Sequence, residues 1–409
     1  MVLIYYQGEI MDLFQKCYDY HIVDDLKKAD IYPYFHSLQS GQDIVVEMDH
    51  HRVIMLGSNN YMGLTNHPEI IEAGVKAIQK YGSSCSGSRF LNGTLDIHVA
   101  LEKELAEFLH KEDCVTFSTG FQSNLAIISA IAGRNDVIIG DKENHASIYD
   151  ACRLSYAKLL RYDHSNMEQL EALLKQVTET EPNKGILIVT DGVFSMGGDL
   201  CKLPEIVKLA KKYGARIMID DAHGLGVFGK NGRGTAEYFG LEDQVDIIME
   251  TFSKSLASLG GCMVASKVVC DYVRHNSRPF IFSASITPVN VQCARKALEI
   301  IKREPERGKN VLEIADYVRK GLRERNIDIR DSVAPIIPIN TYEDERTFIA
   351  SKLLLKNGVY VNSCISPSVP KGEAILRTSF TATHTKPLMD EAMDIIKQTF
   401  DNEIPPLKK

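Results

Sequence analysis

Hydrophobic residues along this chain are grouped in two ways, as short continuous runs and as helical stripes. Between positions 113 and 266, apolar runs that suit buried strands alternate with segments of helical spacing. In 203–213, for example, Ile206, Val207 and Ala210 lie on one apolar face. Strands that alternate with helices predict an α/β fold with a largely parallel sheet covered by helices. The predicted strands are 114–117, 137–139, 159–160, 186–189, 217–219 and 247–249.

The regions on either side of this segment predict further elements. Before it, we expect a helix near 24–28, a hairpin around Asp49-His50-His51 and two helices with apolar stripes. The stripes are Ile71, Val75 and Ile78, and Ile97, Leu101, Leu105 and Phe108. After it, a long helical stretch (289–302, continuing through 311–322) leads into strands 336–339, 359–361 and 374–376 and helices 345–356 and 386–400. We therefore expect an N-terminal segment (1–60), a large domain (61–290) and a small α+β C-terminal domain (291–409).

Composition and charge narrow the class of protein. The chain has 409 residues, 44% of them apolar and 25% charged, which is typical of globular proteins, and no apolar run reaches the length of a membrane span. The net charge of −7 is modest and the basic residues are dispersed, so nucleic acid is not an expected partner. Nine cysteines without a Cys-x-x-Cys pair indicate reduced thiols in a cytoplasm. The apolar start is short and lacks a basic leader, so we expect no secretory signal, with either Met1 or Met11 as the first residue.

Lys254 is the first candidate for chemistry. It follows the predicted strand 247–249 and lies among small and hydroxyl residues, with no acidic partner in the turn. An amine in such a place suits a Schiff base with a carbonyl cofactor better than a surface ion pair. Most single lysines are solvated surface residues, so Lys254 alone does not distinguish a Schiff-base lysine from an ordinary one. The residues at the ends of the neighbouring predicted strands are needed for that distinction.

Polar residues follow several of the other predicted strands, at the edge where open parallel sheets bind ligands. Gly120 lets the chain turn tightly into a helix whose first free amides form an anion site suited to a phosphate, although an ordinary strand-to-helix turn is the alternative. No GxxxxGK[ST] motif is present, which disfavours a nucleotide P-loop. His145 is either an imidazole that covers a ligand or a core histidine.

Asp220 ends the predicted strand 217–219. A carboxylate there is costly unless a donor meets it, and the ring nitrogen of a protonated pyridine would do so. Asp220 and His223 could instead belong to a metal site, for which His145 is the one further candidate ligand. Pyridoxal phosphate needs an amine, an acid for its ring nitrogen, a phosphate site and a ring that covers it. The candidates are Lys254 for the amine, Asp220 for the acid, Gly120 for the phosphate site and His145 for the covering ring.

Six motifs together resemble the α-oxoamine synthases, a family of fold-type I pyridoxal phosphate enzymes that condense an amino acid with an acyl-CoA and release carbon dioxide. The motifs are GSNNYMGL (57–64), GSRFLNGT (87–94), STGF (118–121), NHAS (144–147), DDAH (220–223) and TFSK (251–254). The resemblance covers about residues 20–400. It implies a large domain with a mostly parallel central sheet, a smaller C-terminal domain, and a homodimer with shared active sites.

Carried over by position, the resemblance implies roles around pyridoxal 5'-phosphate. Lys254 would form the Schiff base, His145 would stack on the ring and Asp220 would pair with the ring nitrogen. His223 would donate to the phenolic oxygen, with Ser195 nearby. The phosphate would be held by Gly120, Phe121, Thr251 and Ser253, joined by Ser283 from a second subunit.

The resemblance also implies the substrates. Asn59, Arg377 and, across the dimer, Ser88 would receive the amino-acid carboxylate, which suits the planar fork of an arginine. The strings SRFLNGTLDIH (88–98), FSTGFQSN (117–124) and TFSKSLASLGG (251–261) favour L-serine and palmitoyl-CoA, with 3-ketodihydrosphingosine as the product. The alternatives are a synthase that uses glycine or alanine with a shorter acyl-CoA, and a silent scaffold subunit, against which Lys254 argues. The lipid-like product leaves peripheral membrane contact open.

Three positions depart from the family pattern. Ser84 and Glu250 replace glycines, and Cys262 replaces an aromatic residue. A lost glycine matters where φ was positive. We expect these changes to affect substrate detail more than the chemistry.

Overall fold

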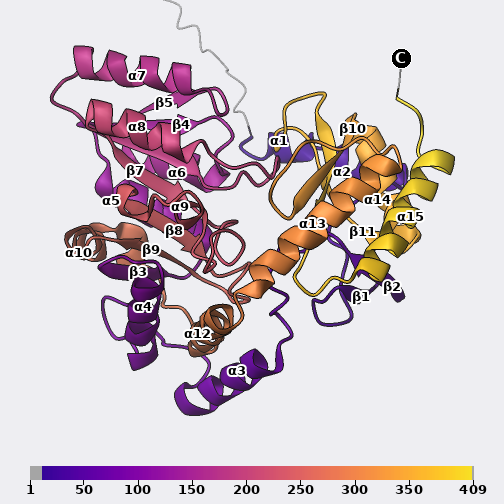
Figure 1. Cartoon of the computed structure of the whole chain (residues 1–409), viewed down its shortest axis with the longest axis horizontal. Coiled ribbons are helices and arrows are strands. Elements are labelled where there is room, and N and C mark those ends of the chain that lie inside the picture. Colours follow the sequence, from indigo (N-terminus) through magenta and orange to yellow (C-terminus); the bar gives the residue numbers. More distant parts are fainter. Residues whose placement is uncertain (1–11, 408–409) are drawn as a thin grey trace, which may run out of the picture.

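The computed structural model describes residues 12–407, which form two lobes with helix α13 (Glu306–Glu324) running from one to the other (Figure 1). Within these residues, the larger lobe has a seven-stranded sheet in the order β3-β9-β8-β7-β6-β4-β5. Neighbouring strands are parallel from β8 to β5, whereas β9 is antiparallel to both of its neighbours. All six predicted strands are confirmed, and so is the mostly parallel sheet of the fold-type I architecture. The strands are β3 (Asp113–Phe117), β4 (Asp136–Asp141), β5 (Lys158–Tyr162), β6 (Gly185–Asp191), β7 (Arg216–Asp220), β8 (Ile247–Thr251) and β9 (Gly261–Ala265).

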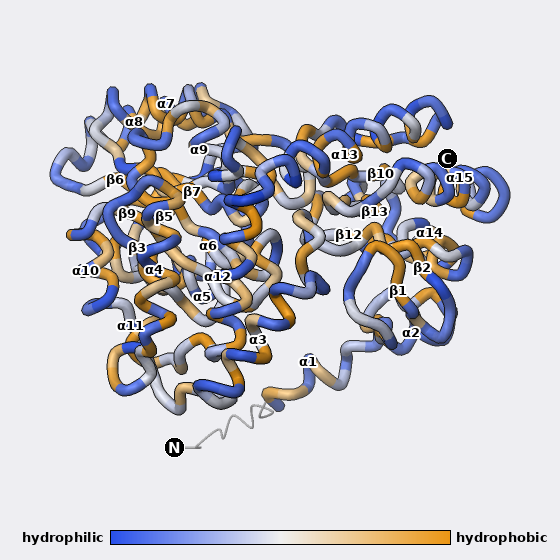
Figure 2. Tube along the Cα trace, turned by 60° about the horizontal axis from the view of Figure 1, so that its bottom comes forward, coloured by the Kyte–Doolittle hydropathy of each residue, from blue (hydrophilic) through white to orange (hydrophobic). Residues whose placement is uncertain are grey.

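Helices cover both faces of this sheet. On one face, side chains such as Leu187 and Val189 belong to a core shared with α5 (Gly120–Ile131), α6 (Ala146–Ser155) and α10 (Lys267–Asn276). The alternate residues Ile186 and Ile188 belong to a core on the other face, shared with α4 (Asp96–Phe108), α7 (Met167–Thr180) and α8 (Leu203–Tyr213). Strands buried on both faces are apolar without interruption, which explains the continuous runs in the sequence. Figure 2 shows these hydrophobic strands inside the lobe.

The smaller lobe combines segments from the two ends of the chain. The hairpin of β1 (Val45–Met48) and β2 (His51–Met55) is confirmed, and its turn residues Asp49 and His50 have positive φ angles of 49° and 64°, which suit a two-residue turn. β2 also pairs in parallel with β11 (Val359–Tyr360). A second sheet has the order β10-β13-β12. The remaining elements of this lobe are α1 (Gln15–Tyr18), α2 (Ile22–Lys28), β10 (Ile336–Tyr342), α14 (Asp344–Lys356), β12 (Asn362–Cys364), β13 (Ala374–Ser379) and α15 (Lys386–Asn402).

The structure corrects some expectations. The stretch 289–322 is two helices, α12 (Pro288–Arg303) and α13, because Pro305 lies between them and cannot donate a backbone hydrogen bond inside a helix. The predicted strand 359–361 is divided between β11 and β12. The stripe of Ile71, Val75 and Ile78 does lie on a helix, α3 (Pro68–Tyr81), but these side chains are 54%, 47% and 46% exposed. The residues that α3 buries are Ile70, Gly74 and Ala77.

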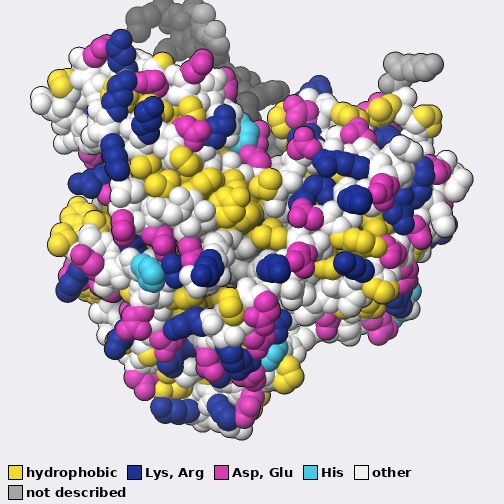
Figure 3. Space-filling model, viewed as in Figure 1, with side chains coloured by type: hydrophobic (Ala, Val, Ile, Leu, Met, Phe, Trp, Pro, Cys, Tyr) yellow, Lys and Arg dark blue, Asp and Glu magenta, His cyan; other side chains and the backbone are white. Residues whose placement is uncertain are grey.

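Other predictions concern the whole chain. No helix in residues 12–407 is long and apolar enough to cross a membrane. Charges of both signs are mixed over the face shown in Figure 3. All nine cysteines are free thiols, and the cytoplasmic location inferred from them stays a prediction. The domain boundaries at residues 60 and 290 also stay predictions, and the choice between Met1 and Met11 lies outside the described residues.

Candidate active site

A cavity of about 270 Å³ lies beyond the carboxyl ends of strands β4, β6, β7 and β8. This is the edge where an open parallel sheet binds ligands. The sequence-predicted residues that line it are Gly120, Phe121, His145, Asp220, His223, Thr251, Ser253 and Lys254. The other lining residues are Thr119, Asn124, Ser147, Asp191, Ala222, Met249 and Leu259.

Lys254 lies in a closed turn after β8. Its carbonyl accepts a hydrogen bond from Ala257 N (3.1 Å), and the carbonyl of the fully buried Phe252 accepts one from Ser258 N (2.9 Å). Burial of the amine lowers the pKa of Lys254 to about 8, even though the negative charge of Asp220 opposes this change. An amine that is partly unprotonated near neutral pH can attack a carbonyl group.

Asp220 and Asp191 are neighbours in the sheet register. Asp220 Oδ2 accepts a hydrogen bond from Asn124 Nδ2 (2.7 Å), and its Oδ1 accepts one from Ala222 N (3.2 Å), so each carboxyl oxygen has a donor. Burial and the charge of Asp220 raise the pKa of Asp191 well above its usual value. This raised pKa favours the neutral form of Asp191 beside the hydrogen-bonded carboxyl group of Asp220.

His145 caps α6 with its own side chain. Its Nδ1 accepts a hydrogen bond from Ser147 N (3.3 Å) and lies 2.7 Å from Ser147 Oγ. Ser147 Oγ in turn accepts from Asn124 Nδ2 (2.8 Å), so Asn124 links His145 to Asp220. The residue is exposed at the mouth of the cavity, where Phe121 lies edge-on with ring centroids 6.3 Å apart. Desolvation of the ring lowers the pKa of His145, with Asp220 opposing and Lys254 assisting.

The N-terminus of α5 provides an anion site beside these groups. Thr119 caps the helix by accepting a hydrogen bond from Gln122 N (3.1 Å). A Cβ atom at Gly120 would lie 2.6 Å from Thr251 Oγ1, so a glycine is needed for this approach of the helix to β8. Thr251 Oγ1 and Ser253 Oγ are 3.0 Å apart. Free amides at a helix start together with two hydroxyls match the needs of a phosphate group.

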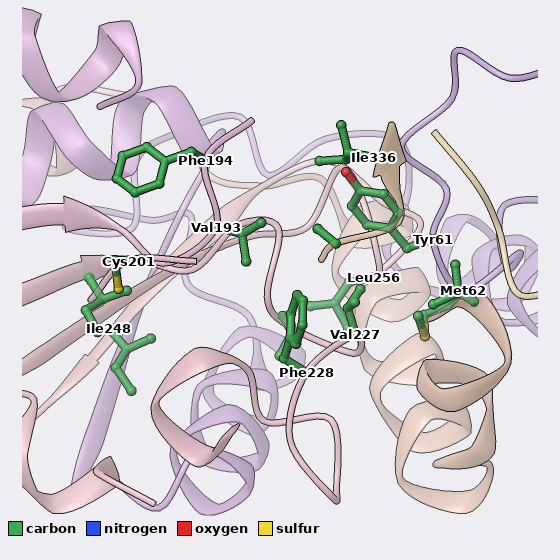
Figure 4. Packing of buried hydrophobic residues seen from close by; sticks show 14 of the residues in the cluster. Tyr61, Met62, Val193, Phe194, Cys201, Val227, Phe228, Ile248, Leu256 and Ile336 are labelled. Atoms are coloured by element: carbon green, nitrogen blue, oxygen red, sulfur yellow. The ribbon is translucent and has the colours of Figure 1, made fainter. Parts of the chain in front are cut away.

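A second series of hydrogen bonds runs from His223 to Arg377. Tyr61 Oη lies 2.7 Å from His223 Nδ1 and 3.3 Å from Asn59 Oδ1, and Figure 4 shows Tyr61 among buried hydrophobic residues. Asn59 Oδ1 also accepts from Arg377 Nη1 (3.1 Å), and Arg377 Nε donates to the Ser195 carbonyl (2.6 Å). Burial, with the nearby charges of Lys254 and Arg377, lowers the pKa of His223 well below its usual value, so this ring is neutral.

Arg377 keeps one donor unused. The residue is buried, yet its Nη2 has no hydrogen-bond partner in the described part of the chain. A buried cationic donor without a partner is costly, and a bound carboxylate would satisfy it. Asn59, Ser195 and Arg377 thus lie together, joined to the cavity through Tyr61 and His223.

Besides Asn59, Ser195 and Arg377, two predicted residues, Ser88 and Ser283, do not line the cavity of a single chain. Ser88 is buried, and its hydroxyl has no hydrogen-bond partner among residues 12–407. Ser283 is partly buried after α11 (Arg278–Ile281). The segments that carry them expose large apolar side chains, namely Phe90 (49%), Leu91 (79%) and Phe282 (75%). Their assignment to the site of a second subunit stays a prediction.

The departures from the family pattern cause no backbone strain, since neither Ser84 nor Glu250 has a positive φ angle. Glu250 is fully buried, and both of its carboxyl oxygens lack hydrogen-bond partners among the described residues. Burial raises the pKa of Glu250 well above its usual value, which favours the neutral acid. Cys262 is its cross-strand neighbour. A smaller residue at 262 thus accompanies a larger one at 250.

Four polar residues that join the predicted ones were missed, namely Asn124, Ser147, Asp191 and Tyr61. Signals for the first three were present in the sequence. Asn124 lies one helical turn after Gly120, Ser147 follows His145 by two positions, and Asp191 ends a strand as Asp220 does. Across residues 12–407, no group of three or more His, Cys, Asp or Glu side chains is placed to hold a metal ion.

Comparisons with known proteins identify the family. Residues 51–396 match the aminotransferase class I and II family. The chain is 49% identical over 381 residues to serine palmitoyltransferase of Sphingobacterium spiritivorum (93% of this chain, 95% of the relative) and 40% identical over 377 residues to 8-amino-7-oxononanoate synthase 1 of Bacillus subtilis (92% and 95%). A solved structure of serine palmitoyltransferase with a pyridoxal phosphate internal aldimine has a TM-score of 0.91 at 34% identity (96% of this chain, 99% of that chain). The chain therefore belongs to the aminotransferase class I and II family and, as its motifs predicted, to the α-oxoamine synthases within it.

Proposed function

We propose that this chain is a serine palmitoyltransferase, which condenses L-serine with palmitoyl-CoA, releases carbon dioxide and forms 3-ketodihydrosphingosine, the first step of sphingolipid synthesis. The observation that carries the proposal is the convergence of Lys254, Asp220, His145 and His223 on one cavity. Similarity to a serine palmitoyltransferase over 93% of the chain supports this member of the family.

Pyridoxal 5'-phosphate fits the groups in this cavity. Lys254 offers a reactive amine, and Asp220 offers a carboxylate for the ring nitrogen. The start of α5 would hold the phosphate with Thr251 and Ser253, while His145 would cover the ring. The neutral His223 would donate to the phenolic oxygen. When bound, this cofactor withdraws the electron pair that remains after the α-proton of an amino acid has left.

The residues of the chain would divide the remaining work. Arg377 and Asn59 would bind the carboxylate of the amino acid, and the unpartnered Nη2 supports this role. The Lys254 amine, with a pKa of about 8, would take up the α-proton as a general base. Asp220 would keep the ring nitrogen protonated, and Asn124 and Ala222 would hold its carboxyl group in position by donating to its two oxygens.

We also propose a homodimer in which Ser88 and Ser283 reach the active site of the partner subunit. The exposed Phe90, Leu91 and Phe282 support this, because they lie on the same segments as Ser88 and Ser283 and a second subunit that covered these segments would bury their apolar surface. Mixing inactive Lys254→Ala subunits with weakened Ser88→Ala subunits tests it. In a mixed dimer with shared sites, one site carries neither change, so activity should return. Activity that stays at the sum of the two variants would contradict the shared site.

The function is tested by the absorbance and the products of purified protein. Adding L-serine, but not glycine or L-alanine, should strongly change the visible spectrum of the bound cofactor. Palmitoyl-CoA should then yield 3-ketodihydrosphingosine, identified by mass spectrometry, and Lys254→Ala should yield none. Faster turnover of glycine or L-alanine with a shorter acyl-CoA would favour a glycine C-acetyltransferase or an 8-amino-7-oxononanoate synthase, and the 40% identity to the latter makes this the alternative to test.

A further inference from the structure

The hydrogen bonds around Asn124 fix the orientation of its amide. Asn124 is fully buried between α5, α6 and the end of β7, and its Nδ2 contacts Asp220 Oδ2 (2.7 Å) and Ser147 Oγ (2.8 Å). An ionised carboxylate only accepts hydrogen bonds, so the amide nitrogen rather than the amide oxygen must face Asp220. Both hydrogens of the amide are then used, one by each partner. The amide oxygen, which has no partner in residues 12–407, faces neither.

This orientation fixes the direction of the next hydrogen bond. Ser147 Oγ accepts from Asn124, so its single hydrogen is free to point to His145 Nδ1, 2.7 Å away. The backbone N–H of Ser147 faces the same nitrogen at 3.3 Å. Two donors thus converge on Nδ1, which must be an unprotonated acceptor. The proton of the neutral ring therefore lies on Nε2, which forms no hydrogen bond to the described residues.

We propose that Asn124 and Ser147 are positioning residues, which hold His145 as the neutral tautomer protonated at Nε2 and so keep that N–H free as a donor at the mouth of the cavity. The significance of this donor for catalysis rests on the proposed function, whereas the tautomer itself does not. The other tautomer and the imidazolium would both direct an N–H at Nδ1 against the two Ser147 donors. The same contacts link the His145 ring to Asp220. The Asn124 amide therefore positions both His145, which is expected to cover the cofactor, and Asp220, which is expected to bind its ring nitrogen.

The tautomer can be measured by ¹⁵N NMR of protein labelled at its histidines, both with and without pyridoxal phosphate. Loss of signals in His145→Asn would assign the ring. We expect an unprotonated, hydrogen-bonded Nδ1 and a protonated Nε2 in both forms. Ser147→Ala should give a mixture of tautomers, and Ser147→Thr, which keeps the hydroxyl, should restore the single one. Ser155→Ala is a matched control on the same helix, since Ser155 Oγ donates to the Cys152 carbonyl, and it should change nothing.

Kinetics give a second readout. Loss of the Ser147 hydroxyl should lower kcat by roughly tenfold, the worth of about one hydrogen bond, while the KM for L-serine stays within about twofold. A protonated Nδ1 in the unmodified protein, or a Ser147→Ala variant with unchanged ring signals, would overturn the proposal. If L-serine is not turned over while the ring signals are as expected, the proposed function is wrong but the tautomer assignment is supported.

Discussion

The reactivity of Lys254 should depend on pH in a way that an ordinary lysine does not. Burial lowers the pKa of this amine from 10.5 to about 8. At about pH 7.5, an amine with a pKa of 8 is unprotonated in about one molecule in four, and one with a pKa of 10.5 in about one in a thousand. We therefore expect Lys254 to combine with an aldehyde about two hundred times faster than an exposed lysine of equal nucleophilicity. The rate should level off above about pH 8.

Stopped-flow absorbance of cofactor-stripped protein mixed with pyridoxal phosphate measures this rate across the pH range. A simple primary amine run in parallel corrects for titration of the aldehyde itself, and borohydride trapping followed by peptide mapping identifies the lysine. The Lys254→Ala variant should give no specific adduct. A rate that still rises about tenfold per pH unit above pH 9, as for an unperturbed lysine, would refute the reasoning about burial. So would trapping at another residue.

Three further predictions follow from the buried charges. Asp220→Asn should lower turnover by roughly a hundredfold or more, whereas Asp191→Asn, which copies the neutral form of that carboxyl, should lower it by no more than about threefold. Equal losses of turnover in steady-state kinetics of the two variants would contradict this division of roles between Asp220 and Asp191. Arg377→Lys should raise the KM for L-serine about tenfold or more and leave that for palmitoyl-CoA unchanged, because it loses the planar fork; parallel shifts in both KM values would contradict this role. Glu250→Gln should match the unmodified protein in thermal stability near pH 4.5 and exceed it at higher pH. The Glu250 pKa is raised in the folded chain, so stability falls by about 1.4 kcal/mol per pH unit from the unfolded pKa up to the folded one; calorimetry that shows no growing difference would exclude a neutral buried acid.

The strands and most of the candidate site could be predicted because local sequence encodes them. A parallel strand covered on both faces is a continuous apolar run, and its carboxyl end is marked by the first polar residue, as at Asp220. Lys254 and His145 were found by the same reasoning, and the family motifs then supplied their roles. The hairpin at Asp49 was equally local, since its turn involves adjacent residues.

What the sequence could not provide depends on packing between distant segments. The contact of Asn124 with Ser147 arises from the packing of α5 against α6, and that of Tyr61 with His223 joins residues far apart in the chain. β9 was missed because Gly261 and Cys262 weaken its strand pattern, and its antiparallel direction follows from a short connection to β8. The exposed residues Ile71, Val75 and Ile78 of α3 have the same helical spacing as a buried apolar face, so the sequence pattern could not show that they are exposed.

The pairing of β2 with β11 has a consequence for biosynthesis. A ribosome must translate nearly the whole message before β2 can pair with β11. Until then, the hairpin of β1 and β2 has one hydrogen-bonding edge unpaired, although the larger lobe has already been synthesised. No single uninterrupted stretch of the gene encodes this lobe. A truncated protein that starts after β2 would lack the neighbour of β11, and attempts to graft this lobe onto a relative must transfer both stretches together.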